Sequence, residues 1–452
     1  MDLGPNFVAP QVRRGVEPRI QPVSRFDGLW RNPDFVRLWA AQTVSVFGSL
    51  ITRTAIPFTA ILLLDASALE VAFLTMCSVL PGVLVGLHAG VWVDRLPRRP
   101  VMIAADIGRF ALLLTVPVAH WLDELHMEHL YAVALSTGVL TMFFDVAYRT
   151  YLPSIVPRQE LMDGNAKLTA SESVAEFSAF SVAGWLVQIF SGPAALLVDA
   201  VTFVLSALSL NAIQRDEPHR AAPEVQPSVR EEALEGLRTV WRDRILRGLT
   251  GATVCWSLGL GMFGAVYMLF VTRGLGFNPG VLGVIFGIGG ISALAGALLA
   301  ERSARRWGVG PSMVAGLAGM GVSMLFIPMA HGAGLAAASL LIAQQVFGDG
   351  MFTVYQVSDT TTRQSITPEH MLGRVNAFMR MLELGLTLTG LLLGGLIGEW
   401  LGLRTALTIG AVLTIGAGAA LLLSPARGVM RLPAPTWPLD AAEPDVALPH
   451  VT

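Results

Sequence analysis

The sequence predicts an all-α membrane protein with twelve transmembrane helices, arranged as two six-helix bundles related by pseudo-symmetry. Three observations predict this class: long apolar runs, basic residues in alternate loops, and an internal repeat. The chain has 452 residues, of which 53% are hydrophobic and 14% charged, and its mean hydropathy is +0.59. Soluble domains carry about 25% charged residues, so one polytopic membrane protein is expected rather than several soluble domains.

Twelve apolar runs are long enough to cross a bilayer. A hydrocarbon core of about 30 Å needs about 20 mostly apolar residues in a helix. The expected spans are 36–64, 68–92, 100–122, 129–152, 166–190, 193–213, 246–272, 278–300, 310–331, 334–358, 374–399 and 401–424.

Arginine is concentrated in the two terminal tails and in every second loop. The opposite loops contain little beyond Arg273 and Arg404. Because basic loops stay on the cytoplasmic side, we expect both termini in the cytoplasm, and that parity requires an even number of spans. The expected units are a basic N-terminal tail (1–34), a first bundle (35–213), a linker (214–245), a second bundle (246–424) and a C-terminal tail (425–452).

The linker contains one amphipathic segment. Its apolar residues, Leu234, Leu237, Val240 and Trp241, recur at helical spacing. This pattern predicts a helix that lies on the cytoplasmic surface.

The chain also repeats itself. Gly82, Gly86, Gly90 and Asp94 lie four residues apart, and the same spacing returns in Gly289, Ala293, Ala297 and Glu301. The charges return as well, because "DRLPRR" (94–99) is matched by "ERSARR" (301–306). Two parallel halves of six spans are typical of transporters whose halves move about a central site.

The stretch "GVWVDRLPRRP" (90–100) combines small residues with an acid and three arginines. Small residues at every fourth position let two helices approach closely, and Asp94 can meet the positive N-terminus of a neighbouring helix. Arg98 and Arg99 can pair with acids or with anionic lipid. We interpret the stretch as a charged latch on the cytoplasmic gate. The alternative is that its arginines serve only topology.

This stretch resembles motif A of the major facilitator superfamily, a Gly-x-x-x-Asp-Arg-x-Gly-Arg-Arg pattern, with Pro97 in place of the usual second glycine. "DIGR" (106–109) fits the continuation of the motif. The segments 198–210, 366–380 and 391–404 resemble the drug:H⁺ antiporter branch, which includes macrolide exporters and the enterobactin exporter. The resemblance covers about 36–424 and implies the major facilitator fold. The Gly-Pro motif that such antiporters often carry in span 5 has no match here.

The resemblance implies a gating network. The motif acid, Asp94, is expected to contact the start of span 11. Arg98 is expected to bridge to an acid on span 4, for which Asp145 is the natural match. The network residues are Gly90, Asp94, Arg95, Arg98, Arg99, Asp145, Glu301 and Arg302.

Charged residues inside the spans need a partner, a water-filled cavity or a function, because each costs about 2.5–3.5 kcal/mol at mid-membrane on insertion scales. Asp145 can pair with Arg149, and Arg380 with Glu383, through helical spacing. Asp199 is expected to be structural. Arg53 is a possible partner for Asp349 or for a glutamate of span 5. The candidates for proton coupling are Glu172, Glu176, Asp349, Asp145 and Glu383.

The resemblance places a cavity between spans 1, 2, 4 and 5 and spans 7, 8, 10 and 11. Aromatic side chains and adaptable methionines suit a loose apolar pocket, although such a stripe also serves packing. The candidates for the cavity are Arg53, Trp256, Phe263, Tyr267, Gln345, Met351 and Tyr355.

The leading hypothesis is a secondary active transporter in the bacterial plasma membrane that exports lipophilic or amphipathic small molecules in exchange for protons, by alternating access. The alternatives are a dedicated exporter of one metabolite, such as a siderophore or a self-made antibiotic, a lipid carrier, or a membrane receptor that binds without transport. We expect no enzymatic activity, because no Gly-x-x-x-x-Gly-Lys-Ser/Thr loop and no nucleophile–base set is present. We also expect no cofactor, no metal, no nucleic-acid partner, and a monomer.

Overall fold

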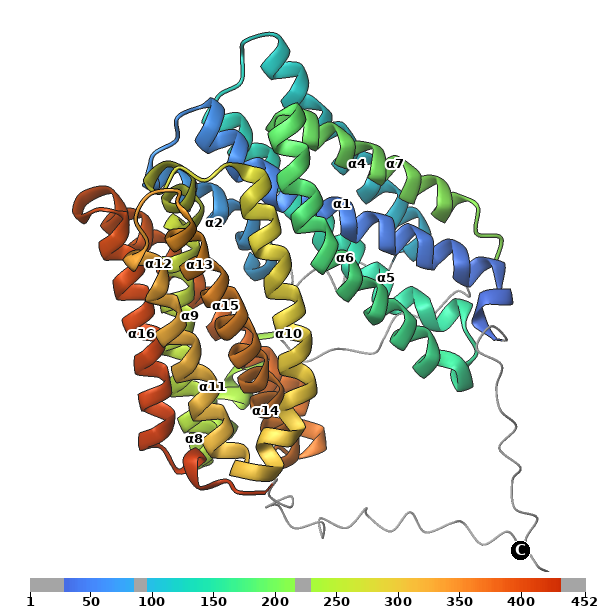
Figure 1. The fold of residues 1–452 in the computed structure, drawn as a ribbon. Helices are drawn as coiled ribbons and strands as arrows, with labels where there is room; N and C mark the ends of the chain where they lie inside the picture. The colour runs from blue at the N-terminus through green and yellow to red at the C-terminus, as the bar shows by residue number, and fades with distance from the viewer. Residues whose placement is uncertain (1–27, 85–95, 216–228, 432–452) are drawn as a thin grey trace, which may run out of the picture.

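The computed structural model describes residues 28–84, 96–215 and 229–431, and these residues form helices joined by turns (Figure 1). Eleven of the described helices are long and apolar enough to cross a membrane. A further apolar helix, α2 (Ala68–Leu84), has 17 residues up to the edge of the described range. The expected all-α architecture with twelve spans is confirmed.

The helices form two bundles, coloured blue to green and yellow-green to red in Figure 1. The first bundle contains α1 (Pro33–Leu63), α2, α4 (Arg98–Trp121), α5 (Met127–Ile155), α6 (Leu161–Phe190) and α7 (Gly192–Asn211). The second contains α9 (Arg244–Leu269) with η3 (Phe270–Gly274), α10 (Pro279–Trp307), α11 (Val309–Met324) with α12 (Phe326–Met329), α13 (Leu335–Gln344) with η4 (Gln345–Asp349) and α14 (Gly350–Ile366), α15 (Glu369–Leu401) and α16 (Leu403–Leu423). Short turns η1 (Leu29–Arg31), η2 (Arg158–Glu160) and η5 (Pro425–Gly428) flank the spans.

Equivalent helices make equivalent contacts in the two bundles. In the first bundle α1 packs on α6 and α7, and in the second α9 packs on α15 and α16. Likewise α4 packs on α5 and α7, and α11 on α14 and α16. Between the bundles, α6 packs on α10, and α15 packs on α2. The two halves of the internal sequence repeat therefore also have the same helix packing.

Local sequence signals explain where several helices begin. Asn32 precedes Pro33, and its side-chain oxygen accepts hydrogen bonds from the backbone N–H groups of Asp34 (3.1 Å) and Phe35 (3.3 Å). Asp243 caps α9 in the same way through Ile245 and Leu246. Such caps satisfy N–H groups that have no partner within the helix, so these helices have defined first turns.

Two spans of the second bundle contain a turn of π-helix, η3 and η4. Single π-helical turns inside longer helices are frequent at functional sites. Ser292 of α10 donates a hydrogen bond to the carbonyl of Val346 inside η4. The carbonyl is thus satisfied although the helix is locally widened.

The bundles meet at the end where α6 and α15 finish and where α10 and α2 begin, and they diverge toward the end where α1 begins and α16 finishes (Figure 1). Glycine allows the close approach. A Cβ on Gly184 would lie 2.9 Å from the Cα of Gly283. A Cβ on Gly395 would lie 2.6 Å from the Cβ of Ala72. We call this end the closed end and the other the terminal end.

The linker helix α8 (Val229–Arg242) packs on α15 at the terminal end. Arg374 of α15 forms a 2.8 Å ion pair with Glu235 of α8. Gly236 contacts the backbone carbonyl of Arg374, where a larger residue would collide. The linker helix is therefore attached to the second bundle.

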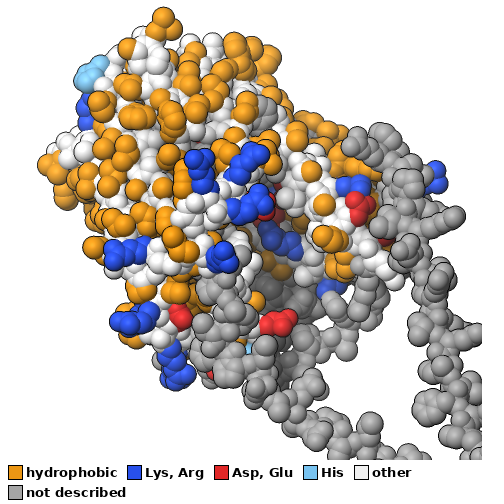
Figure 2. All heavy atoms as spheres, turned by 60° about the horizontal axis from the view of Figure 1, so that its bottom comes forward, with side chains coloured by type: hydrophobic (Ala, Val, Ile, Leu, Met, Phe, Trp, Pro, Cys, Tyr) orange, Lys and Arg blue, Asp and Glu red, His pale blue; other side chains and the backbone are white. Residues whose placement is uncertain are grey.

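Basic side chains gather on the terminal end, which faces the reader in Figure 2. Described arginines lie there after α7 (Arg215), in the last turns of α10 (Arg302, Arg305 and Arg306), at the end of α14 (Arg363) and at the start of α15 (Arg374), among other places. At the closed end the described arginines are Arg273 and Arg404. The charge asymmetry predicted from the sequence is therefore also an asymmetry between the two ends of the fold.

Candidate functional site

The α1–α2 turn at the closed end is held by two charged residues of the second bundle. Arg273 of η3 donates from Nη2 to the carbonyl of Ile61 (2.6 Å) and from Nη1 to the carbonyl of Ala66 (2.9 Å). Its Nη2 also lies 2.7 Å from Oδ1 of Asp65. Glu399 of α15 accepts a 3.2 Å hydrogen bond from the backbone N–H of Ala68.

These charges match the helix ends that they contact. The C-terminal end of a helix carries partial negative charge and the N-terminal end partial positive charge. Arg273 lies at the end of α1, and Glu399 lies at the start of α2. We call Arg273, Glu399 and the turn from Ile61 to Ala68 the closed-end clasp.

Two further contacts join α6 and α10 beside the clasp. Ser181 Oγ donates to the carbonyl of Gly283 at 3.0 Å. Gln188 Oε1 accepts from the N–H of Gly280 at 2.8 Å. These bonds involve the first turns of α10, so they also depend on the bundles meeting at the closed end.

The predicted gating network is only partly covered by the structure. Gly90, Asp94 and Arg95 lie outside the described residues. Arg98 is buried at the start of α4, and its Nε donates to Thr150 Oγ1 of α5 at 2.9 Å. That contact lies one turn beyond Asp145 on the same helix.

Arg99 caps a helix rather than pairing with an acid. Its Nε donates to the carbonyl of Leu210 (2.9 Å) and its Nη2 to that of Asn211 (2.6 Å), at the C-terminal end of α7. In the second bundle, Glu301 forms an exposed 3.1 Å pair with Arg305 of the next turn, and Arg302 is exposed as well.

Two proton-coupling candidates of the first bundle lie close together. Glu172 of α6 accepts a 3.2 Å hydrogen bond from Gln42 of α1. Asp145 of α5 is half-buried, and Glu172, Arg109 and Arg149 all interact electrostatically with it. Three helices thus bring Glu172 and Asp145 together. The side chain of Glu176 lies outside the described residues.

A buried charge network that the sequence did not reveal lies behind this pair. Arg109 and Asp106 of α4 form an ion pair, and both are at most 1% exposed. The Arg109 guanidinium also lies 4.1 Å from the ring centroid of Phe203 and 4.6 Å from that of Phe144. The i,i+3 spacing in "DIGR" was a signal for such a pair. We attributed those residues to a motif instead.

Asp199 of α7 completes this network. Its carboxylate accepts hydrogen bonds from Thr52 of α1 and, at 2.8 Å, from Thr202. Arg109 interacts with it electrostatically. Gly48 of α1 provides the space for this side chain, because a Cβ there would overlap the Asp199 carboxylate. α1, α4 and α7 are therefore joined by polar groups inside the bundle.

In the second bundle, the structure brings Asp349 and Gln345 of η4 to Gly289 of α10. A Cβ on Gly289 would collide with Oδ2 of Asp349 and with the amide nitrogen of Gln345. Asp349 also interacts electrostatically with Tyr267 of α9. Among the described residues, the hydroxyl of Tyr267 has no hydrogen-bond partner, and it is buried. We refer to Tyr267, Gln345 and Asp349 together as one polar group, because Asp349 and Gln345 both lie at Gly289 and Asp349 acts electrostatically on Tyr267.

Aromatic rings connect this polar group with the other bundle. Tyr267 stacks on Phe263 (4.8 Å between centroids) and lies 5.8 Å from Phe286 of α10. Phe286 lies 6.2 Å from Phe180 of α6. The predicted cavity residues Phe263 and Tyr267 therefore lie near the boundary between the bundles.

The other candidates for the cavity are distributed differently. Trp256 is buried against Phe352 at 5.2 Å, and Tyr355 is 3% exposed. Met351 packs on Gly319 of α11. Arg53 of α1 is exposed.

Arg380 and Glu383 form the expected i,i+3 ion pair, at 3.1 Å. Asp359 and Arg363 of α14 form a second pair at 3.0 Å, and Asp359 is 6% exposed. Glu383 interacts electrostatically with Asp359. The sequence analysis did not single out this buried pair, although its i,i+4 spacing is a recognisable signal.

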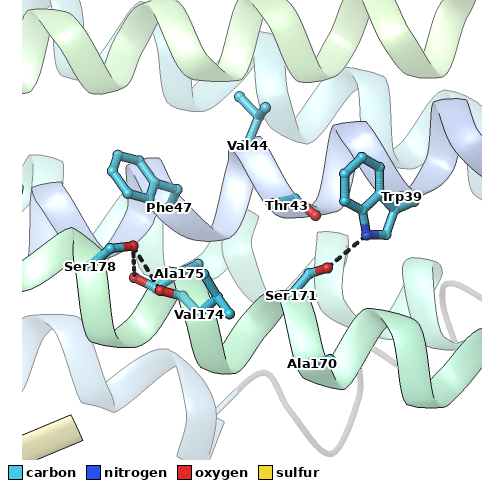
Figure 3. A pocket seen from close by; sticks show the side chains of 9 residues that line it. All are labelled: Trp39, Thr43, Val44, Phe47, Ala170, Ser171, Val174, Ala175 and Ser178. Carbon is cyan, nitrogen blue, oxygen red and sulfur yellow. Dashed lines mark hydrogen bonds between the residues drawn. The ribbon is translucent and has the colours of Figure 1, made fainter. Parts of the chain in front are cut away.

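A cavity of about 420 Å³ lies between α1 and α6 (Figure 3). α1 contributes Trp39, Thr43, Val44 and Phe47, and α6 contributes side chains from Ala170 to Ser178. Trp39 Nε1 donates to Ser171 Oγ at 2.7 Å across it. We call this cavity the α1–α6 groove. Within the described part of the chain, no three His, Cys, Asp or Glu side chains are placed to hold a metal ion.

Residues 38–385 match the family model of the Major Facilitator Superfamily. The chain belongs to this superfamily. This facilitator is 25% identical over 403 residues to YfiS of Bacillus subtilis, named as an uncharacterized MFS-type transporter, with 87% of the chain and 94% of YfiS covered. It is 26% identical over 389 residues to the multidrug efflux pump Tap of Mycolicibacterium fortuitum, with 83% and 91% covered. It is therefore a membrane transporter and not an enzyme.

The solved structures agree with the fold of this facilitator. A bacterial homologue of the iron transporter ferroportin in its inward-facing state superposes with a TM-score of 0.71 at 18% identity, over 87% of this chain and 98% of that one. The same homologue in its outward-facing state gives a TM-score of 0.55, over 86% and 98%. Both comparisons show that the chain has the same fold as this homologue.

Proposed function

We propose that this facilitator exports lipophilic or amphipathic small molecules in exchange for protons, by alternating access. The observation that carries the proposal is the Glu172 carboxylate inside the bundle, which accepts a hydrogen bond from Gln42 of α1 and interacts electrostatically with Asp145 of α5. Carboxylates inside transmembrane helices mark ion and proton pathways. The similarity to an efflux pump supports export.

The charge asymmetry assigns the direction of opening. The terminal end carries most of the described arginines (Figure 2). By the positive-inside rule this end lies in the cytoplasm, so the structure is open inward and closed outward. The closed-end clasp is then the external gate. The described part of the latch stretch, 96–100, lies at the opposite end, which must close in the other state.

Glu172 is the residue that we assign to the proton. Its carboxylate accepts the amide of Gln42, and it interacts with Asp145 rather than with a cation of its own helix. A proton on Glu172 removes a charge from the contact between α1 and α6. Because α6 also packs on α10, the protonation state of Glu172 acts on the helix that joins the two bundles.

The test uses the purified chain in liposomes with ethidium as the transported probe. An imposed proton gradient should drive ethidium movement, and a trapped pH dye should report proton release. Glu172→Gln should abolish gradient-driven movement while downhill ethidium exchange persists. Glu160→Gln, which alters an exposed acid just before α6, is the matched control. Full gradient-driven transport by Glu172→Gln would move the proton site to Asp145 or Asp349.

A further inference from the structure

We infer that the α1–α6 groove is a phospholipid site, in which one acyl chain lies in the groove and the phosphate meets Lys167. The inference does not rest on the proposed transport activity. It rests on the lining of the groove, its direction, and the residues at its terminal-end mouth.

The groove has the lining that an acyl chain needs. On α1, Trp39, Thr43 and Phe47 recur at every fourth residue, so they share one face over about 12 Å of helix. On α6, Val174 and Ala175 form the opposite wall. The hydroxyl of Ser178 is already bonded to the carbonyl of Val174 at 2.7 Å. The walls therefore present almost no free polar group along this length.

The groove faces away from the transport residues. Ser171 lines the groove, and the next residue, Glu172, points toward Gln42. Successive residues of a helix point about 100° apart, so the carboxylate and the groove lie on different sides of α6. Val174 is 66% exposed, and Trp185, three turns further along the same face, is 49% exposed. This face of a membrane-spanning helix contacts lipid.

The mouth of the groove has the features of a membrane interface. Lys167, the single lysine of the chain, lies one turn before Ser171 on the same face of α6. Its Nζ lies 5.8 Å from the ring centroid of Trp30, and Trp30 packs edge-on against Trp39 at 5.0 Å. Tryptophan is enriched at headgroup level, and lysine extends its ammonium to the same level.

The charges at the mouth of the groove suit the phosphate of a bound lipid better than a dissolved anion. Lys167 pairs with Asp163, whose side chain is 52% exposed, while that of Lys167 is 23% exposed. The pair is neutral overall, so it does not attract anions over a long range. Lys167 retains N–H donors that a headgroup phosphate can accept once the acyl chain is held. Both zwitterionic and anionic phospholipids carry this phosphate, so the site does not require an anionic lipid.

One hydroxyl in the groove is left without a partner. Thr43 Oγ1 is buried and has no hydrogen-bond partner among the described residues. Figure 3 shows Thr43 on the side of α1 that faces α6, between Trp39 and Phe47. A buried polar atom without a partner costs free energy. The ester region of a lipid supplies acceptors for this hydroxyl.

The test uses the full chain in liposomes that contain phosphatidylcholine with a photoactivatable diazirine in one acyl chain. After illumination, labelled peptides are mapped by mass spectrometry. We expect segments 39–47 and 170–178 to be labelled well above segment 291–298 of α10, which is also apolar and exposed at Ile291 and Leu294. Equal labelling of all three segments would overturn the proposal.

Two variants separate the groove from general lipid contact. Val174→Trp fills the groove from an exposed position and should remove the excess labelling, whereas Leu294→Trp on α10 should not. Lys167→Gln should lower the groove labelling, because the phosphate then loses the ammonium at the mouth. Unchanged labelling in Val174→Trp contradicts the site. Displacement of the label by ethidium would assign the groove to a transported molecule instead.

Discussion

Arg273 of the second bundle caps the C-terminal end of α1 in the first, with hydrogen bonds of 2.6 Å and 2.9 Å to the carbonyls of Ile61 and Ala66. Between them, Asp65 adopts a left-handed backbone conformation (φ 55°) and pairs with the same guanidinium. The turn between α1 and α2 is therefore completed by a residue of the other bundle. Such a turn is complete only while the closed end stays closed.

We predict that Arg273→Gln shifts the facilitator toward the state that is open at the closed end. Hydrogen bonds to charged groups contribute about 1.5–3 kcal/mol each, so the ratio of the two states should change by roughly tenfold or more. Spin labels at Met162 and Trp307, both exposed at the terminal end, should report a larger population at short distance, because that end closes as the other opens.

Arg404 provides the control for this experiment. It also donates to backbone carbonyls at the closed end, but those of Pro328 and Ala330 belong to its own bundle. Arg404→Gln should leave the distance distribution unchanged. Glu399→Gln should shift it in the same direction as Arg273→Gln. If all three variants gave the distance distribution of the wild type, the clasp would not hold the gate closed.

We predict that Gly184→Val reduces transport by weakening the α6–α10 contact. The added side chain would meet the Cα of Gly283 at 2.9 Å and its backbone nitrogen at 3.0 Å, and neither can move without a shift of a whole helix. Ethidium transport in liposomes should fall, and the spin-label distances should shift as for Arg273→Gln. Gly385→Val on α15, where nothing lies within 4 Å of the added Cβ position, is the control. Wild-type behaviour of Gly184→Val would contradict close helix contact as a condition for closure.

We predict that Arg109→Leu strongly destabilises the fold. Removal of one partner from a buried ion pair leaves an uncompensated charge and costs about 3–5 kcal/mol. Asp106, which is fully buried, would lose its ion-pair partner. The thermal unfolding midpoint in detergent should drop clearly. The double variant Asp106→Leu/Arg109→Leu should recover part of the loss, since the Asp106 carboxylate is then no longer left without its partner.

The pair of Arg37 and Asp34, at 2.9 Å, gives the comparison for Arg109→Leu. Its partly exposed side chains should contribute only about 0–1 kcal/mol, so Arg37→Leu should leave the unfolding midpoint nearly unchanged. If Arg109→Leu behaved like Arg37→Leu, the buried network would have no role in stability.

We predict that Gly289→Ala impairs transport without preventing folding. The new methyl group would occupy the space of the Asp349 carboxylate and the Gln345 amide, so both side chains must move from their present positions. The unfolding midpoint should fall by less than in Arg109→Leu, while ethidium transport should fall clearly. Gly264→Ala on α9 is the control, because the nearest atom, from Leu391, lies at 3.8 Å. Normal transport by Gly289→Ala would argue against a role for this polar group.

The positions of the spans follow from the sequence alone. The expected limits of the first span, 36–64, differ from α1 (Pro33–Leu63) by three residues at most. Apolar length decides this, because a helix must satisfy its own backbone inside lipid. The pair of Arg380 and Glu383 was also predicted, since i,i+3 neighbours on one helix meet regardless of what surrounds the helix.

Three features depend on the tertiary structure: the closed-end clasp, the hydrogen bond from Gln42 to Glu172, and the joining of Asp199 to the Asp106–Arg109 pair. Each unites residues of different helices, and the direction in which a helix turns its side chains is set by packing against its neighbours. In the sequence, Arg273 is a lone cation in a loop between two expected spans. Only the meeting of the two bundles brings it to the carbonyls of α1, where its charge matches the partial negative charge at that helix end.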